Sequence, residues 1–233
     1  MSRSVMIFGV LCAAALVLFV TSRRQAATAV AAAAATAAAI PDPAVDEKLA
    51  TKPGQETLVL AGGCFWGVQT VFKHVKGVIR STAGYSGGAL KNPDYETVSS
   101  GSTGHAESVE IVYDPSVITL GQLLKVFFSV VHDPTQLNRQ GPDTGTQYRS
   151  AIFFNSPEQE RIVKAYIEQL TQAKIYSHPI VTQIVALDGF YPAESYHQDY
   201  AEHHPDNPYI QICDIPKMNN LREQFPNLYV ANP

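Results

Sequence analysis

Hydrophobic and polar positions follow two periods along the chain, and the changes between them predict the elements. Residues 58–61 form a short apolar run followed by Gly62 and Gly63, which is typical of a buried strand that ends in a turn. Apolar residues within 68–75 then recur at helical spacing. We therefore expect a strand, a tight turn and a helix whose first residue is Cys64.

The rest of this region interleaves further strands and helices. Helical spacing predicts one helix over 119–132 and another after Ser156, where Ser156, Pro157 and Gln159 form a capping signal. Strand patterns occur at 78–85, 107–113, 151–154 and 182–187. Residues 133–150 are polar, glycine-rich and long for a passive connection, which suggests a functional loop. Because no regular strand–helix repeat occurs, we predict a single α+β domain. It has a mixed β-sheet with packed helices, a two-layer sandwich of ferredoxin-like character.

The N-terminal residues differ in composition from the rest of the chain. Residues 5–20 are an apolar run, short for a transmembrane helix and suited to the core of a signal peptide. Arg23 and Arg24 follow it, so an uncleaved membrane anchor is the alternative, and a cytoplasmic protein with a disordered tail is a third interpretation. We expect export to the periplasm or another extracytoplasmic compartment, or anchoring in the membrane by this segment.

A linker is expected between this segment and the fold. Residues 26–39 are almost pure alanine, and prolines follow them. The predicted organisation is a signal peptide or membrane anchor over residues 1–24, an Ala/Pro-rich linker over 25–54, and a folded domain over 55–233.

Composition and charge exclude several classes of function. The chain has 233 residues and a net charge of −4, without the basic excess typical of nucleic-acid binding. Its three cysteines are too few for a disulfide framework, and they form no Cys-x-x-Cys pair or structural zinc pattern. Cys12 lies in the N-terminal apolar run, which leaves Cys64 and Cys213 in the folded domain.

The position of Cys64 favours nucleophilic chemistry. Unpaired N–H groups and the helix dipole at a helix N-terminus favour an anion, so we expect a lowered pKa for the thiol. Phe65 and Trp66 place aromatic surfaces beside it, which suits a small apolar substrate group with a polar atom attached. A buried structural cysteine is the alternative. The strand, Gly-Gly turn and helix around Cys64 favour the reactive interpretation.

Glu107 is the second candidate. It shares strand parity with Val109, Ile111 and Tyr113, so its side chain should point to the apolar side of the sheet. A carboxyl group held there prefers its neutral form, which raises its pKa and makes it a usable general acid near neutral pH. The alternative is an exposed glutamate that precedes the strand.

Seven short motifs occur in order along the predicted domain. They are Gly63-Cys64-Phe65-Trp66-Gly67, Gly84-Tyr85-Ser86-Gly87-Gly88, Asn92-Pro93-Asp94-Tyr95, Gly104-His105-Ala106-Glu107, His132-Asp133-Pro134-Thr135-Gln136, Gly145-Thr146-Gln147-Tyr148-Arg149-Ser150 and Tyr196-His197-Gln198-Asp199-Tyr200. Together they closely resemble the A-type peptide methionine sulfoxide reductases, over roughly residues 58–229. Residues 55–233 would then be the catalytic domain of such an enzyme.

The resemblance implies an oxidoreductase that repairs proteins by reducing methionine sulfoxide of the S epimer, free or in peptides, to methionine. Cys64 would attack the sulfoxide sulfur and remain as a sulfenic acid, with Phe65 and Trp66 forming the pocket for the methyl group. No organic cofactor and no metal are implied.

The resemblance also implies hydrogen-bond donors for the sulfoxide oxygen. They are Tyr95, Tyr148 and Glu107, with Glu107 as the proton donor, because the oxygen leaves only when it gains a proton and donors. Asp143 would belong to the polar network near the site. From the residues alone, ordinary half-buried packing is the alternative for both tyrosines.

The C-terminal segment departs from the best-known family pattern, which ends in a Gly- and Cys-rich tail. Residues 208–217 resemble a variant tail, and their prolines and polar residues suggest a surface segment able to approach the site. Cys213 is the only other thiol of the domain. We predict a Cys64–Cys213 disulfide that thioredoxin or a related dithiol protein reduces, with a buried strand cysteine as the alternative.

Two other classes of function stay open on the residues alone. A thiol hydrolase or acyltransferase would pair Cys64 with His105 or His197, although we interpret His197 as an orienting or packing group. A redox sensor would oxidise Cys64 without turning over a sulfoxide. A metal site is not predicted, because no strong template matches Glu194, His197, His203 and His204.

Overall fold

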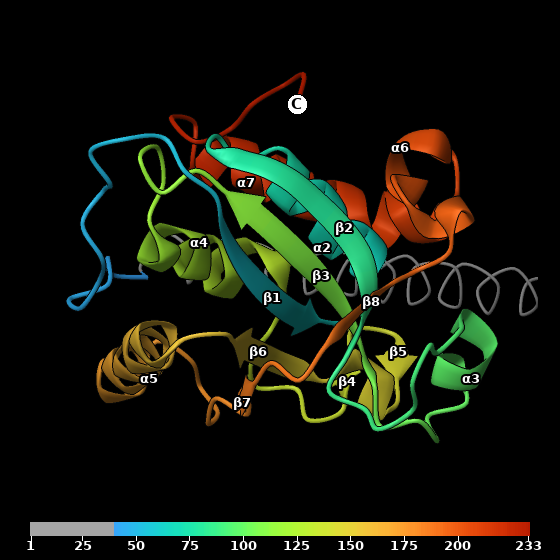
Figure 1. Cartoon of the computed structure of the whole chain (residues 1–233). Helices are drawn as coiled ribbons and strands as arrows, with labels where there is room; N and C mark the ends of the chain where they lie inside the picture. Colours follow the sequence, from blue (N-terminus) through green and yellow to red (C-terminus); the bar gives the residue numbers. More distant parts are fainter. Residues whose placement is uncertain (1–39) are drawn as a thin grey trace, which may run out of the picture. The chain divides into compact units, whose positions relative to one another are not determined.

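A six-stranded mixed sheet forms the centre of the fold (Figure 1). The computed structural model describes residues 40–233, and the predictions for residues 1–39 lie outside this range. The strand order is β7-β6-β1-β3-β2-β8, antiparallel except for the β6–β7 pair. The strands are β1 Glu56–Gly62, β2 Val78–Ser86, β3 Ala106–Tyr113, β6 Ser150–Phe154, β7 Gln183–Ala186 and β8 Phe190–Pro192. The predicted α+β class and mixed sheet are confirmed.

The helices are α2 Phe65–Lys73, α3 Tyr95–Ser99, α4 Leu120–Val126, α5 Pro157–Gln172, α6 Tyr200–His203 and α7 Ile215–Gln224. Residues of α2, α4, α5 and α7 join strand residues in the large core cluster on one face of the sheet. Shorter helical turns are η1 Phe127–Val131, η2 Thr146–Tyr148, η3 Ser195–His197 and η4 Ile210–Asp214, and a small hairpin is formed by β4 Arg139–Gln140 and β5 Asp143–Thr144. Figure 1 shows α2 beside α7 and α4 beside α5.

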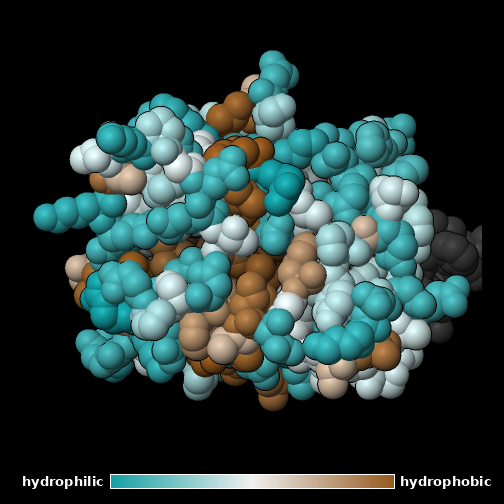
Figure 2. Space-filling model, in the orientation of Figure 1, coloured by the Kyte–Doolittle hydropathy of each residue, from teal (hydrophilic) through white to brown (hydrophobic). Residues whose placement is uncertain are grey.

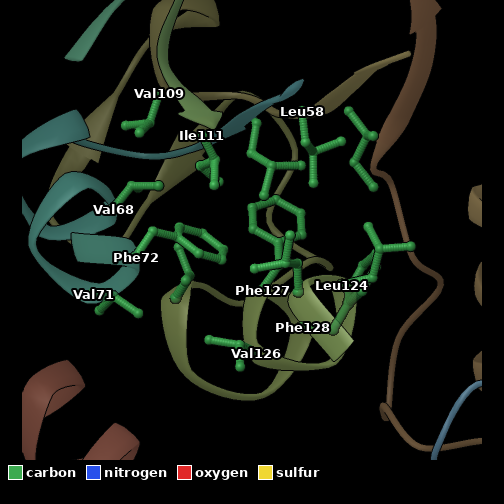
Figure 3. Packing of buried hydrophobic residues seen from close by; sticks show 14 of the residues in the cluster. Leu58, Val68, Val71, Phe72, Val109, Ile111, Leu124, Val126, Phe127 and Phe128 are labelled. Carbon is green, nitrogen blue, oxygen red and sulfur yellow. The ribbon is translucent and has the colours of Figure 1, made fainter. Parts of the chain in front are cut away.

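Strand alternation explains why the core lies on the helical side. Leu58 and Leu60 of β1 point into the large cluster, whereas Val59 and Ala61 point to a smaller cluster on the opposite face. In Figure 3 the strand side chains meet those of α2, α4 and η1 within the large cluster. Apolar surface also gathers along the middle of the molecule between hydrophilic margins (Figure 2).

The predicted helix starts are largely correct. Thr119 caps α4, and the predicted helix continues beyond α4 as the wider turn η1. Ser156 accepts from the N–H of Gln159 at 3.2 Å, as the capping signal predicts. The Gln159 side chain, however, accepts from the N–H of Asn155 at 3.0 Å rather than from Ser156. The N-terminal cap is therefore formed, but the hydrogen bond to the Gln159 side chain comes from the residue before Ser156.

The expected start of the fold near residue 55 is wrong. Residues 40–233 form one compact unit, although residues 40–54 contain no helix or strand. Ile40 is buried in the core. Asp46 accepts from Thr119 Oγ1 at 2.6 Å and from the N–H of Gly121 at 2.9 Å. The anion therefore satisfies the N-terminus of α4, which holds this part of the expected linker on the domain.

The expected surface tail at the C-terminus is also wrong. Residues 210–224 form η4 and α7, which pack against α2. The tail then pairs with the turn after α2, where the N–H of Lys76 donates to the carbonyl of Leu228 at 2.7 Å. Cys213 thus lies in a packed helical segment and not in a strand. Within residues 40–233, no helix is long and apolar enough to span a membrane.

Candidate active site

The sheet brings Cys64 and Glu107 to the same edge. Leu60 pairs with Val109, and since β1 and β3 are antiparallel, the end of β1 lies beside the start of β3. Cys64 follows β1 after two glycines, and Glu107 is the second residue of β3. Gly63 has a φ of +93°, and a side chain there would meet Gln140 of β4. The loop around β4 therefore covers the turn that carries Cys64.

The expected lowering of the Cys64 pKa is wrong for this state of the protein. Cys64 occupies the N-cap position, one residue before the start of α2, without a side-chain capping hydrogen bond, and is only 8% exposed. Burial raises the pKa of its thiol well above the ordinary value, and the charges of Glu107 and Asp214 raise it further. The nearby backbone N–H of Trp66 and the charge of Lys217 act in the opposite direction. Desolvation therefore outweighs the helix N-terminus, and the resting group is a thiol.

Glu107 matches the expectation for a neutral carboxyl group. It is 2% exposed, and its Oε2 accepts from the backbone N–H of Phe65 at 3.0 Å. Burial raises the pKa of Glu107 to about 8, against the effect of the Phe65 hydrogen bond and with a contribution from Asp143. The side chain is therefore mostly protonated at neutral pH, beside the backbone that follows Cys64.

Both predicted tyrosines lie within the electrostatic reach of Glu107. Burial, followed by the charge of Glu107, raises the pKa of Tyr95 and of Tyr148. Tyr95 begins α3, and its N–H donates to Glu194 Oε1 at 2.9 Å. The same carboxylate accepts from Tyr85 at 2.9 Å. The raised pKa values mean that Tyr95 and Tyr148 keep their protons and can act as hydrogen-bond donors. Glu194 fixes the start of α3, a role that the sequence did not indicate.

Trp66 is held by an aromatic cage. Its indole stacks on Tyr200 with ring centroids 3.9 Å apart and meets the edge of Tyr209 at 6.0 Å. Its Nε1 donates to His197 Nδ1 at 3.1 Å. Phe65, which is fully buried, packs against both His197 and Trp66, with ring centroids 5.1 and 6.5 Å apart. The two aromatic residues after Cys64 therefore form one wall.

Neither candidate histidine is free to act as a base for Cys64. His197 Nδ1 accepts the Trp66 hydrogen bond, and burial lowers the pKa of His197, so the ring is neutral and orients the wall. His105 accepts from the N–H of Gly88 at 3.2 Å and contacts the carbonyl of Leu90 at 2.8 Å. The geometry thus gives no support to a Cys–His hydrolase.

Asp143 meets a residue of the C-terminal segment that the sequence did not indicate. The hydroxyl of Tyr209 donates to Asp143 Oδ2 at 2.5 Å. In the same segment, burial raises the pKa of the Cys213 thiol, and the charge of Asp214 raises it further. Cys64 and Cys213 are both free, and Cys213 is half-buried. Tyr209 therefore connects the loop of Asp143 with the segment that carries the second thiol.

Cys64 provides a buried thiol, and the protonated Glu107 and two phenols lie beside it. The thiol can remove an oxygen atom from a substrate while these neighbours donate protons to that oxygen. Chemistry of this kind places the chain among the thiol oxidoreductases. Residues 56–228 match the family described as "Peptide methionine sulfoxide reductase". The chain therefore belongs to the peptide methionine sulfoxide reductases.

Relatives and solved structures agree with this assignment. The chain is 59% identical to "Peptide methionine sulfoxide reductase MsrA 2" of Mesorhizobium japonicum, over 81% of this chain and 96% of that relative. It is 50% identical to "Peptide methionine sulfoxide reductase MsrA 2" of Synechocystis, over 80% and 88%. Mxr1 of Saccharomyces cerevisiae in its reduced form has a TM-score of 0.61 and 34% identity, over 70% of this chain and 92% of that chain.

The methionine sulfoxide reductase A of Corynebacterium diphtheriae has a similar structure, with a TM-score of 0.57 and 39% identity over 66% of this chain and 77% of that chain. The fold and the family together identify the activity. The protein is an oxidoreductase that reduces methionine sulfoxide with thiols and so repairs oxidised proteins.

Proposed function

We propose that Cys64 is the nucleophile and Glu107 the proton donor of sulfoxide reduction. The observation that carries this proposal is the hydrogen bond from Phe65 to Glu107, which sets a neutral carboxyl group beside the turn of Cys64. The Cys64 sulfur attacks the sulfoxide sulfur while Glu107 protonates the oxygen. In the adduct that forms, the new sulfur–sulfur bond and the sulfur–oxygen bond to methionine both break as the hydroxyl group moves to the Cys64 sulfur. Methionine leaves, Cys64 becomes a sulfenic acid, and the thiol proton restores Glu107.

The substrate methyl group would lie against the wall of Phe65 and Trp66, with Tyr95 and Tyr148 donating to the oxygen. This arrangement supports selectivity for one epimer, because exchanging the methyl group and the oxygen would put a polar atom on the aromatic wall. The resemblance to the family implies that this is the S epimer. Asp143 orients Tyr209 at the edge of the same wall.

Recycling of Cys64 would use Cys213 and an external dithiol protein such as thioredoxin. The thiol of Cys213 displaces water from the sulfenic acid to form a Cys64–Cys213 disulfide, which the dithiol then reduces. Support comes from the position of Cys213 in η4, the turn that directly follows Tyr209, whose ring meets the edge of Trp66. Because η4 is packed, a local shift of this turn would accompany disulfide formation.

A thiol count tests this scheme. Reduced protein is mixed with methionine sulfoxide of each epimer, without reductant, and methionine and free thiols are measured. We expect one methionine per chain with the S epimer and loss of two thiols, but loss of one in Cys213→Ser. Cys64→Ser should form no methionine, because a hydroxyl group is a far weaker nucleophile. Normal turnover by Cys64→Ser would overturn the nucleophile, and full thioredoxin-driven turnover by Cys213→Ser would remove the resolving role.

We also propose that residues 1–24 direct export or anchor the enzyme in the membrane, so that repair occurs outside the cytoplasm. The apolar run of residues 5–20 and the alanine tract support this location. Residues 1–50 can be fused to a reporter that is active only after export. A silent reporter, together with soluble full-length protein in the cytosol, would contradict the proposal.

A further inference from the structure

A buried ion pair lies close to Cys64 and has no part in the scheme above. Lys217 Nζ of α7 donates to Asp214 Oδ1 at the end of η4, at 3.1 Å. The Asp214 side chain is 2% exposed and that of Lys217 is 15% exposed. The second oxygen of Asp214, Oδ2, is buried without a hydrogen-bond partner among the described residues. Because only one oxygen of this carboxylate is paired, its negative charge is poorly neutralised. In a buried region such a charge acts on other groups over several ångströms.

The pair rests directly on the helix that begins after Cys64. A Cβ atom on Gly67 would overlap Asp214 Oδ1 and would come within 2.7 Å of Lys217 Nζ. Gly67 is three positions after Cys64, so the two residues share one side of the helix start. Glycine at this position therefore lets both charges approach the backbone of the first turn of α2.

We propose that Asp214 and Lys217 are positioning residues that set the protonation state of the Cys64 thiol. The two charges act through space in a dry region, where Coulomb interactions are weakly screened. The Asp214 carboxylate disfavours a thiolate at Cys64, and the Lys217 ammonium favours it. Burial is the main reason that Cys64 rests as a thiol, and the Asp214 anion adds to this effect by offsetting Lys217. This inference rests on the proposed role of Cys64 as the nucleophile.

Other groups also face Cys64. Glu107 has a pKa of about 8, so above this pH its charge also raises the pKa of the Cys64 thiol, in wild type and variants alike, whereas both site phenols keep their protons. Tyr209 also lies near Cys64, and Asp143 and Cys213 lie near Asp214. Lys217 is a cation that favours the Cys64 thiolate, against the effect of Asp214. Its removal should therefore have an effect opposite to that of removing Asp214.

The test is the pH dependence of Cys64 alkylation in the full-length protein. Iodoacetamide labelling of the Cys64 peptide is followed by mass spectrometry, which separates it from Cys213. In Asp214→Asn the midpoint should fall by about one pH unit, with roughly tenfold faster labelling at pH 7. In Lys217→Gln the midpoint should rise, because Asp214 is ionised at the alkaline pH where Cys64 titrates. The double variant should lie between the two.

Opposite shifts separate a charge effect from a loosened structure. If the pair only holds η4 and α7 in place, both single variants expose Cys64 and move the midpoint in the same direction. A shared direction, or no shift in either variant that folds, would overturn the inference. Lys73→Met is the matched control, since Lys73 lies in the last turn of α2 and pairs with Asp199 at 2.9 Å. It should leave the Cys64 midpoint unchanged.

The readout does not depend on sulfoxide turnover. Labelling measures the thiol itself, so a failed prediction for Asp214 and Lys217 leaves the nucleophile assignment intact. Conversely, normal methionine formation by Cys64→Ser would overturn the nucleophile while the labelling midpoints still report the local charges.

Discussion

The backbone N–H of Phe65 donates to Oε2 of Glu107 at 3.0 Å. The residue after the nucleophile thereby orients the carboxyl group on the neighbouring strand. Because Oε2 accepts this hydrogen bond, the proton of the neutral acid belongs on Oε1. One contact between α2 and β3 thus sets both the position of the acid and the oxygen from which its proton leaves.

Removal of this proton should slow reduction and change its pH dependence. With a pKa of about 8, Glu107 loses its proton above this pH, so the wild-type rate should fall as pH rises through 8. Glu107→Gln should lower the rate of methionine formation roughly 10²-fold and should remove the decline. Single-turnover assays from pH 6 to 10 measure both effects. Glu110→Gln, on the same strand, is the control, and its rate should still fall as pH rises through 8. If the rate of Glu107→Gln also falls through this pH range, the assignment of Glu107 is contradicted.

Acid should destabilise the protein through His132. Its Nε2 meets Ser150 Oγ at 2.7 Å, and burial lowers the pKa of His132 to about 4 from 6.5. As the pH falls, the unfolded chain protonates His132 before the folded chain does. The free energy of unfolding should therefore be fully present above pH 6.5 and should fall between pH 6.5 and 4. Because the residue as a whole is half-buried, we expect a loss of about 1–3 kcal/mol.

Urea unfolding at pH 7.5 and pH 5 measures this loss. His132→Gln should lower stability at pH 7.5 and flatten its dependence on pH. His178→Gln is the control, since His178 is exposed, and should keep the wild-type dependence. An equally steep dependence in His132→Gln would assign the acid sensitivity to another group.

The segment before β1 should contribute measurably to stability. Asp46→Ala removes two hydrogen bonds at the start of α4 and should cost about 1–2 kcal/mol. Asp42→Ala, in the same segment, removes only an exposed ion pair with Lys125 and should cost less than about 1 kcal/mol. Thermal unfolding of the full chain compares them, and equal melting temperatures would show that residues 40–54 add little.

Gly67 should not tolerate alanine. In an ordinary helix interior, Gly→Ala stabilises by about 1 kcal/mol, but here the added methyl group would overlap Asp214. We expect Gly67→Ala to lower the free energy of unfolding by about 1–3 kcal/mol. Gly189→Ala is the control, because its nearest neighbour would lie at 3.7 Å. Unchanged stability in Gly67→Ala would mean that η4 yields without cost.

Local periodicity was sufficient to predict the centre of the fold. The alternation in β3 put Glu107 on the buried side, and the glycines after β1 marked the turn that carries Cys64. These features depend on neighbours within a few positions, which is the range that periodicity reports. The raised pKa of Glu107 followed from its face of the strand, so the sequence was enough to predict it.

Features that depend on distant partners were missed or wrong. The pKa of Cys64 is governed by its burial and by charges that lie far along the chain, including Asp214. Residues 40–54 have no regular structure, and side-chain contacts from Asp46 hold them. The C-terminal helix α7 was hidden because it buries little more than Leu221 and its polar residues suggest an exposed segment. Periodicity carries no information on such contacts.

The order of synthesis gives the late position of Asp214 a further consequence. Cys64 leaves the ribosome well before β6, which pairs with β1, and before η4 and α7, which close over Gly67. Until those residues arrive, the thiol is neither desolvated nor held beside its carboxylates, so it has the ordinary reactivity of an exposed cysteine. The Cys64 thiol of the nascent enzyme is therefore oxidised more easily than that of the folded enzyme. It becomes protected only when the last part of the chain has folded over it.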